Sequence, residues 1–129
     1  MSFTLIDPAS GYSNGLLTDA GGRLLFIAGQ IAWDQNQKIV SEDFVEQFDR
    51  ALENVVNVIQ AAGGNADNVA RLVIYVTDKV EYRERTKEVG ERYRKHMGKH
   101  FPPMALVEVK GLLDDRAKVE IEGMAVLPA

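Results

Sequence analysis

One amphipathic segment, residues 44–62, constrains the fold of this chain more than any other part of its sequence. Its apolar side chains recur at helical spacing and form one stripe over about five turns of 3.6 residues. The stripe consists of Phe44, Phe48, Ala51, Leu52, Val55, Val56, Ile59 and Ala62. Gly63 and Gly64 follow it, as is common where a helix ends in a left-handed conformation. A helix with a single apolar stripe must bury it against a second layer.

Strand-like segments can supply that second layer. The strongest lies at residues 69–76, where bulky apolar residues fill positions 72–76. We expect the other strands at residues 3–6, 16–19, 23–27, 104–110 and 118–126. A second helix is predicted after Asp78, because Glu81 three residues later completes a pattern that resembles a capping box. The apolar face of this helix comprises Tyr82, Thr86, Val89, Tyr93 and Met97.

The order of these elements predicts an α+β fold in one domain, residues 1–129. Three strands precede the first helix, one strand separates the two helices, and two strands close the chain. Because each helix has one apolar face, both should pack on the same face of a mixed sheet. In the last strand, Val119 and Ile121 point to one face and Glu120 points to the other. The second face is therefore partly polar and needs a cover of its own.

Composition excludes several classes of protein. The chain has no cysteine, so it forms no disulfide and uses no thiolate nucleophile. Its net charge is −4, and basic residues alternate with glutamates through residues 81–95, so we expect no nucleic-acid partner. No apolar run approaches the roughly 20 residues of a membrane span, and the N-terminal residues lack the pattern of a signal peptide. We therefore expect a cytoplasmic protein with no membrane partner.

Several short motifs follow one another in a distinctive order. They are Gly29-Gln30-Ile31, Ala51-Leu52-Glu53-Asn54-Val55, Ala61-Ala62-Gly63-Gly64, Val76-Thr77-Asp78 and Val119-Glu120-Ile121-Glu122. In their joint order and spacing they resemble the RidA (YjgF) family of small imine and enamine deaminases over nearly the whole chain. The resemblance implies a chorismate-mutase-like α/β sandwich. It also implies a homotrimer whose sheets surround a central barrel, with three ligand clefts between subunits.

The resemblance implies two catalytic residues. A glutamate in the last strand of the family deaminases positions the water that attacks the imine carbon, and it corresponds to Glu120. A tyrosine near the N-terminus closes the cleft and corresponds to Tyr12, while Gly29 matches a glycine of the pocket. Water adds easily to a polarised C=N bond, so no cofactor is expected. The implied activity is hydrolytic release of ammonia from a small enamine or imine metabolite bound at the subunit interface.

Four positions depart from the family's binding residues. Met104 replaces the arginine that grips the substrate carboxylate, Ala28 replaces a serine, and Leu106 replaces a small polar or sulfur-containing residue. Lys87 occupies the region of an asparagine in the second helix. A charge-assisted hydrogen bond contributes about 1.5–3 kcal/mol, whereas methionine offers only a soft apolar wall. The cleft should therefore be more apolar than in a 2-iminobutanoate deaminase, which argues against activity on carboxylate-bearing 2-imino acids.

Each candidate residue also has a structural interpretation. Glu120 could form an ion pair with a strand lysine such as Lys118, and Tyr12 could anchor its loop on a neighbouring subunit. Met104 fits a packing role. Trp33, which follows the glycine motif, either lines the cleft or packs as an interface anchor.

Charged residues around the second helix leave two further questions. Lys87 or Arg85 could supply the missing cation, although a solvated face is the ordinary interpretation of a charge-rich helix. His96 and His100 have the spacing of metal ligands, but Gly98 breaks the helix between them and no third ligand is evident. We therefore expect no metal site, and we interpret both histidines as residues that favour the negative end of a helix dipole.

Three functions follow from these observations. The first is a trimeric enamine or imine deaminase. The second is a non-catalytic trimer of the same fold that binds a small metabolite or another protein, and Met104 is its main support. The third, an endoribonuclease, is attached to the family by name, and the acidic chain argues against it.

Overall fold

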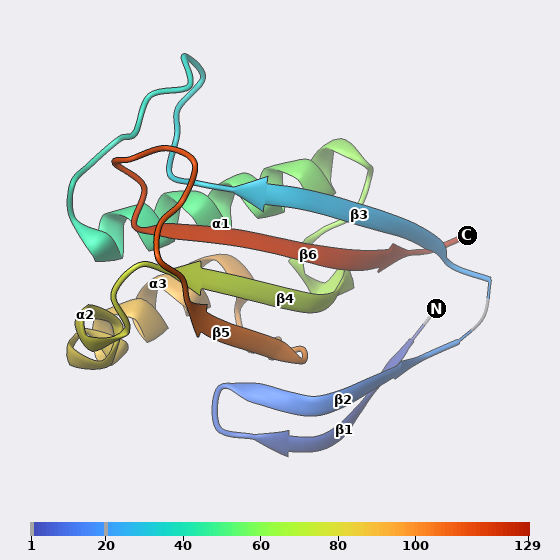
Figure 1. The fold of residues 1–129 in the computed structure, drawn as a ribbon. Helices are drawn as coiled ribbons and strands as arrows, with labels where there is room; N and C mark the ends of the chain where they lie inside the picture. Colours follow the sequence, from blue (N-terminus) through green and yellow to red (C-terminus); the bar gives the residue numbers. More distant parts are fainter. Residues whose placement is uncertain (1, 20) are drawn as a thin grey trace.

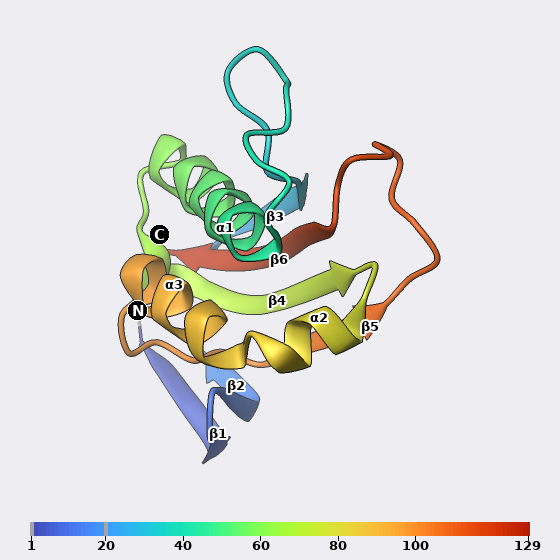
Figure 2. The same ribbon diagram turned by 90° about the vertical axis from the view of Figure 1, so that its left-hand side faces the viewer.

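The computed structural model describes residues 2–19 and 21–129 and contains a four-stranded sheet, a layer of helices and a separate hairpin (Figures 1 and 2). The strands are β1 (Phe3–Ala9), β2 (Tyr12–Thr18), β3 (Arg23–Gln30), β4 (Val69–Val76), β5 (Met104–Glu108) and β6 (Val119–Leu127). The helices are α1 (Phe44–Ala61), α2 (Lys79–Glu84), α3 (Thr86–Met97) and a short 3-10 turn, η1 (Ala66–Asn68). In these described ranges, no helix has both the length and the apolar character needed to cross a membrane.

The main sheet has the strand order β3-β6-β4-β5 and is mixed, as predicted. Strand β6 pairs antiparallel with both β3 and β4, whereas β5 pairs parallel with β4. Helices α1 and α3 lie side by side on one face of this sheet, as Figure 2 shows. The predicted α+β sandwich with both helices on one face is therefore confirmed.

The core lies between α1 and the sheet. The largest buried side chains of the predicted stripe are Phe44, Phe48, Leu52 and Ile59. Helix α1 begins where the Asp43 carboxylate accepts a hydrogen bond from the backbone N–H of Glu46. It ends before Gly63, whose φ of 92° lies in the left-handed region. Both helix boundaries thus follow from residues within or next to the segment itself.

The second predicted helix is interrupted. Helix α2 ends and α3 begins at Arg85, whose φ of −120° and ψ of 20° are not helical. The Arg85 guanidinium lies 3.1 Å from Asp43 and 2.8 Å from Glu88, and these ion pairs hold the break in place. Thr86, just after the break, is exposed, whereas Tyr82, before it, is half-buried and packs against the core.

The first two strands form a hairpin outside the main sheet, and both are longer than predicted. Strand β1 continues past Asp7, which adopts a φ of 50°, and β2 already begins at Tyr12. The turn between them uses Gly11, at a φ of 83° that favours glycine. The buried Ser13 hydroxyl ties the hairpin to the main body by donating to the Phe101 carbonyl over 2.8 Å.

The sheet face away from the helices carries both apolar and polar side chains, as predicted. Leu24 and Phe26 of β3 are 61% and 71% exposed. They alternate with Ile27, which is buried in the helix-side core, so they belong to the outer face. Glu120 and Glu122 of β6 share this face. In a single copy the outer face is therefore uncovered.

Candidate functional site

The strand register separates two of the predicted site residues. Met104 is paired with Leu72 of β4, whose side chain is buried on the helix side. Glu120 is paired with Tyr75 of β4, which belongs to the alternate, outer set of side chains. Residues directly opposite one another on neighbouring strands point to the same face. Met104 and Glu120 therefore lie on opposite faces, and within one copy they line different pockets.

The first pocket, here called the carboxylate pocket, has a volume of about 490 Å³. It is lined by Gly29, Ile31, Trp33, Gln37, Leu113, Asp114 and Glu120. Three residues singled out in the sequence thus come together here, namely Gly29, Trp33 and Glu120. The Glu120 side chain is half-buried, so both the protein and a ligand or water can contact it.

Gly29 makes the position of the Glu120 carboxylate possible. A Cβ atom on Gly29 would overlap this carboxylate, so the two residues approach as closely as a glycine allows. A β-bulge between Ile27 and Gln30 shifts the register at this point. Ala28 lies in the bulge, where its carbonyl accepts a hydrogen bond from the Gln30 side-chain amide over 3.1 Å. Only a residue without a side chain fits at position 29 while Glu120 keeps this conformation.

The Glu120 carboxylate has no hydrogen-bond or ion-pair partner in the part of the chain that the structure describes. The alternative of an ion pair with Lys118 is not found, because the Lys118 Nζ lies 3.8 Å from Glu81 instead. Glu122, on the same face, differs because the Tyr75 hydroxyl donates a hydrogen bond to it. This hydrogen bond raises the pKa of Tyr75. Of the two carboxylates, Glu120 is the one available to water or a ligand.

Two amides of α1 hold the loops around the carboxylate pocket. The Asn54 Nδ2 donates to the carbonyls of Ile31 and Trp33, both over 3.0 Å. Gln47 is fully buried, and its Nε2 donates to the Arg116 carbonyl over 3.1 Å. The loop after β3 and the loop before β6 therefore take their positions from the same helix.

Trp33 both packs and lines the carboxylate pocket. It packs on the small cluster of Ile31, Ile39 and Ala117, and its backbone forms a bridge with Ile39. Since Trp33 also belongs to the lining of the pocket, its packing holds an aromatic wall beside the carboxylate.

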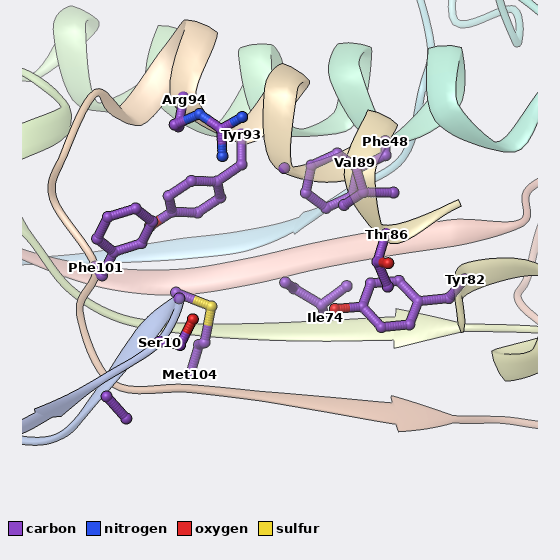
Figure 3. Close-up of a pocket in the computed structure, with 13 residues that line it drawn as sticks. Ser10, Phe48, Ile74, Tyr82, Thr86, Val89, Tyr93, Arg94, Phe101 and Met104 are labelled. Carbon is purple, nitrogen blue, oxygen red and sulfur yellow. The ribbon is translucent and has the colours of Figure 1, made fainter. Parts of the chain in front are cut away.

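The second pocket, here called the aromatic cavity, has a volume of about 610 Å³ (Figure 3). It is lined by Ala9, Ser10, Gly11, Phe48, Ile74, Tyr82, Thr86, Val89, Gly90, Tyr93, Arg94, Phe101 and Met104. At one end the rings of Tyr93 and Phe101 stack with centroids 5.3 Å apart. The Tyr93 hydroxyl donates to the His100 carbonyl over 2.6 Å, and burial raises the pKa of Tyr93. Met104 thus belongs to the apolar part of the wall of this cavity.

The remaining predicted residues line neither pocket within the described ranges; they are Tyr12, Ala28, Lys87 and Leu106. Leu106 packs against the core on the helix side. Lys87 is exposed on α3, while its neighbour Thr86 lines the aromatic cavity. Tyr12 is 41% exposed at the start of β2. In a single copy, Tyr12 therefore closes neither pocket.

The aromatic cavity also contains residues to which the sequence assigns other places. Helical spacing predicts Tyr82 and Thr86 on a core-facing stripe, but the break at Arg85 leaves them at the cavity. Arg94 belongs to a charge-rich segment that would ordinarily be solvated. A signal for Arg94 does exist in the sequence, because Gly90 stands one turn before it inside the helix, where glycine is unfavourable.

The two histidines take part in structural contacts. The His96 Nε2 lies 2.5 Å from the Asp49 carboxylate, and the His100 Nε2 lies 2.7 Å from the Val69 carbonyl oxygen. Burial by itself would raise the pKa of Asp49, but hydrogen bonds from His96 and Arg92 hold that pKa below its usual value. Residues 2–19 and 21–129 contain no group of three or more His, Cys, Asp or Glu residues that could hold a metal ion.

A family model and several known proteins match this chain over most of its length. The model described as Endoribonuclease L-PSP matches residues 4–127. A RutC family protein of Pyrococcus horikoshii is 32% identical over 119 residues, covering 92% of this chain and 88% of its own. The 2-iminobutanoate/2-iminopropanoate deaminase of Salmonella typhimurium is 32% identical over 108 residues, covering 81% and 80%. The crystal structure of the Rid family protein YyfB from Yersinia pestis superposes with a TM-score of 0.85 at 26% identity, covering 98% of this chain and 100% of that one.

Proposed function

This chain belongs to the Endoribonuclease L-PSP family, which includes Rid, YjgF and RutC proteins, and on this basis we propose that it hydrolyses small enamines or imines with Glu120 as the catalytic carboxylate. One observation carries the proposal. The Glu120 carboxylate lies in a pocket, against Gly29, and has no partner among the described residues. The similarity to a protein named 2-iminobutanoate/2-iminopropanoate deaminase supports this class of reaction.

The chemistry requires a base beside a water molecule. An enamine becomes an imine when a proton is added to its carbon and another is lost from its nitrogen. Glu120 then accepts a proton from water while the water oxygen forms a bond to the imine carbon and the imine nitrogen takes a proton from solvent. In the resulting carbinolamine the protonated Glu120 gives its proton to the nitrogen, the C–N bond breaks to release ammonia, and the hydroxyl forms the C=O bond as its proton returns to solvent. One imine and one water thus give one carbonyl compound and one ammonia, with no cofactor consumed.

We infer that the working form is a homotrimer, because the proposed residues for catalysis and binding lie toward opposite edges of the sheet. Glu120 stands on β6 beside the edge strand β3, whereas Met104 stands on the other edge strand, β5. A second copy whose β3 edge approaches this β5 edge would place the Glu120 pocket of one copy beside strand β5 of the next, and three such contacts can close a ring. The exposed Leu24 and Phe26 support an assembly that covers the outer face. Light scattering should give about three times the chain mass of 14.3 kDa.

The trimer also provides a role for one residue that lines neither pocket in one copy. Tyr12 would close the cleft from a neighbouring subunit, as an exposed aromatic on the hairpin can. Leu106 receives a packing role only, because it lies against the helix-side core, and Ala28 receives no role beyond its place in the β-bulge. Lys87 receives no role in the proposal, because Thr86, not Lys87, lines the aromatic cavity.

Ammonia release from 2-aminoacrylate and 2-iminobutanoate, generated in place by a dehydratase, tests the proposal. Glu120→Gln should lower the rate by about 100-fold or more, since general base catalysis typically contributes about 10²–10⁴-fold. Glu122→Gln is the matched control, because it removes the same charge from the same strand and face but from a residue bonded to Tyr75. It should keep most of the rate. Equal losses in the two variants would contradict the assignment of Glu120, and no ammonia release by either the wild type or Met104→Arg would contradict the deaminase proposal.

Met104 favours a second function. An apolar side chain in place of a carboxylate-binding arginine suits a protein that binds a small metabolite or another protein without turnover. Such a protein should gain thermal stability with its ligand and release no ammonia. RNA cleavage is a third activity, named in the family's description. The net charge of −4 argues against it, and its rate would have to depend strongly on salt.

A further inference from the structure

Arg94 is the one cation among the described residues that line the aromatic cavity. Figure 3 shows it on α3, at the side of the cavity where Tyr93 and Phe101 stack. Other arginines nearby are engaged, since Arg85 and Arg92 both form ion pairs with carboxylates. Arg94 forms none within residues 2–19 and 21–129. Its charge is therefore available to an anion that enters the cavity.

Gly90 leaves room beside the helix for the Arg94 guanidinium. Gly90 lies inside α3, and its backbone is not in the left-handed region that would call for glycine. Glycine in a helix interior is destabilising relative to alanine. A Cβ atom at this position would lie only 3.2 Å from the Arg94 Nη1, which is closer than ordinary contact. The glycine thus lets the guanidinium lie against the helix at the cavity wall.

The rest of the wall fits an organic molecule with an apolar body. Met104, Ile74 and Phe101 supply apolar and aromatic surface, and the hydroxyls of Tyr82 and Thr86 add polar groups. The volume of about 610 Å³ falls inside the range of about 300–1,000 Å³ that is usual for small-molecule sites. A four-carbon imino acid would fill only a small part of this space.

We propose that Arg94 binds the carboxylate of an aromatic or branched-chain organic acid whose apolar body fills the aromatic cavity. A guanidinium offers a planar pair of donors that matches a carboxylate. The cation is thus supplied by α3 and not by position 104 on β5. This inference goes beyond the proposed function, because it concerns binding: within one copy the aromatic cavity and the Glu120 carboxylate lie on opposite faces of the sheet.

Calorimetric titration of the intact protein with 3-phenylpropanoate tests the binding step without turnover. Arg94→Gln should weaken the affinity by about tenfold or more, because a charge-assisted hydrogen bond is lost. Arg83→Gln is the matched control, since Arg83 is an exposed arginine of α2 outside the cavity lining. It should leave the affinity unchanged. The neutral 3-phenylpropanamide should bind the wild type and Arg94→Gln about equally.

A second variant separates binding from folding. Gly90→Ala should raise the Tm slightly, because alanine favours the helix, and should change the affinity for 3-phenylpropanoate far less than Arg94→Gln does, because the flexible Arg94 side chain needs to shift only by a few tenths of an ångström. The inference is overturned if the wild type does not bind 3-phenylpropanoate. It is also overturned if Arg94→Gln binds as tightly as the wild type, or if Lys87→Gln weakens binding as much. If the protein binds 3-phenylpropanoate but releases no ammonia from any substrate, this inference stands and the deaminase proposal fails. If the protein releases ammonia and Arg94→Gln binds 3-phenylpropanoate as tightly as the wild type, the deaminase proposal stands and this inference fails.

Discussion

The carboxylate pocket and the aromatic cavity differ in how much change each can accept. In the carboxylate pocket, Glu120 approaches Gly29 so closely that no side chain fits there, and amides of α1 hold the surrounding loops. The walls of the aromatic cavity need only be apolar and of suitable size, with Arg94 beside them. The first pocket accepts a side chain at position 29 only if the Glu120 carboxylate moves, whereas the contacts of the second pocket set a looser limit on its wall residues. A protein built this way can keep its chemistry while its ligand changes.

The largest effect is expected where the carboxylate pocket is tightest. Gly29→Ala would put a Cβ atom into the space of the Glu120 carboxylate and force the carboxylate away from the reacting water. Turnover of 2-aminoacrylate should fall by about 100-fold or more, while binding of 3-phenylpropanoate should change little. Steady-state kinetics and calorimetry on one preparation measure both quantities. If affinity falls as much as turnover, the two pockets are not independent.

A smaller effect is expected from the aromatic cavity. Met104→Arg should raise kcat/KM for 2-iminobutanoate by about tenfold, because a new charge-assisted hydrogen bond contributes about 1.5–3 kcal/mol and 1.4 kcal/mol is one factor of ten. Met104→Gln has a similar length without the charge and serves as the control. The ammonia assay with graded substrate separates the three proteins. No gain from the arginine would mean that position 104 does not limit the use of small carboxylates.

The smallest effect concerns α3, which forms one wall of the aromatic cavity. Burial by itself would raise the pKa of Asp49, but hydrogen bonds from His96 and Arg92 keep that pKa low in the folded protein. The stabilisation is therefore complete above the unfolded pKa of about 3.9 and is lost as pH falls through the lower folded value. Asp49→Asn should lower the free energy of unfolding by about 1 kcal/mol at pH 7. Its Tm should also fall less than that of the wild type when the pH is lowered from about 5 to about 3. Thermal unfolding followed by circular dichroism measures both quantities. If the Tm of the variant and of the wild type fall equally with pH, Asp49 is not the source of this pH dependence.

Local sequence patterns predict those parts of the fold whose limits are decided by neighbouring residues. The stripe of α1, its cap at Asp43 and its end before Gly63 are all contained in one segment. The break at Arg85 is not predicted by its own segment, and Arg85 there forms an ion pair with Asp43, 42 residues away in the chain. The attachment of the hairpin to the main body also comes from a distant contact, between Ser13 and Phe101.

The candidate site divides in the same way. The motifs around Gly29 and Glu120 predict that these residues lie together, and they do. Their separation from Met104 is decided by the registers of β4 with β5 and with β6, which no single segment contains. The charge pattern of the helix does not single out Arg94, because a charged helix residue has the same pattern whether it faces solvent or a cavity. The local signal is Gly90, one turn before Arg94 inside the helix.

The amide contacts of α1 have a consequence for kinetic experiments. Neither Gln47 nor Asn54 titrates at any pH at which the protein is folded. Their hydrogen bonds to the loops at Trp33 and Arg116 therefore persist unchanged from one buffer to the next. A shift in a pH–rate profile then reports ionisable groups that contact the substrate, and not a change in how the helix holds the walls around them.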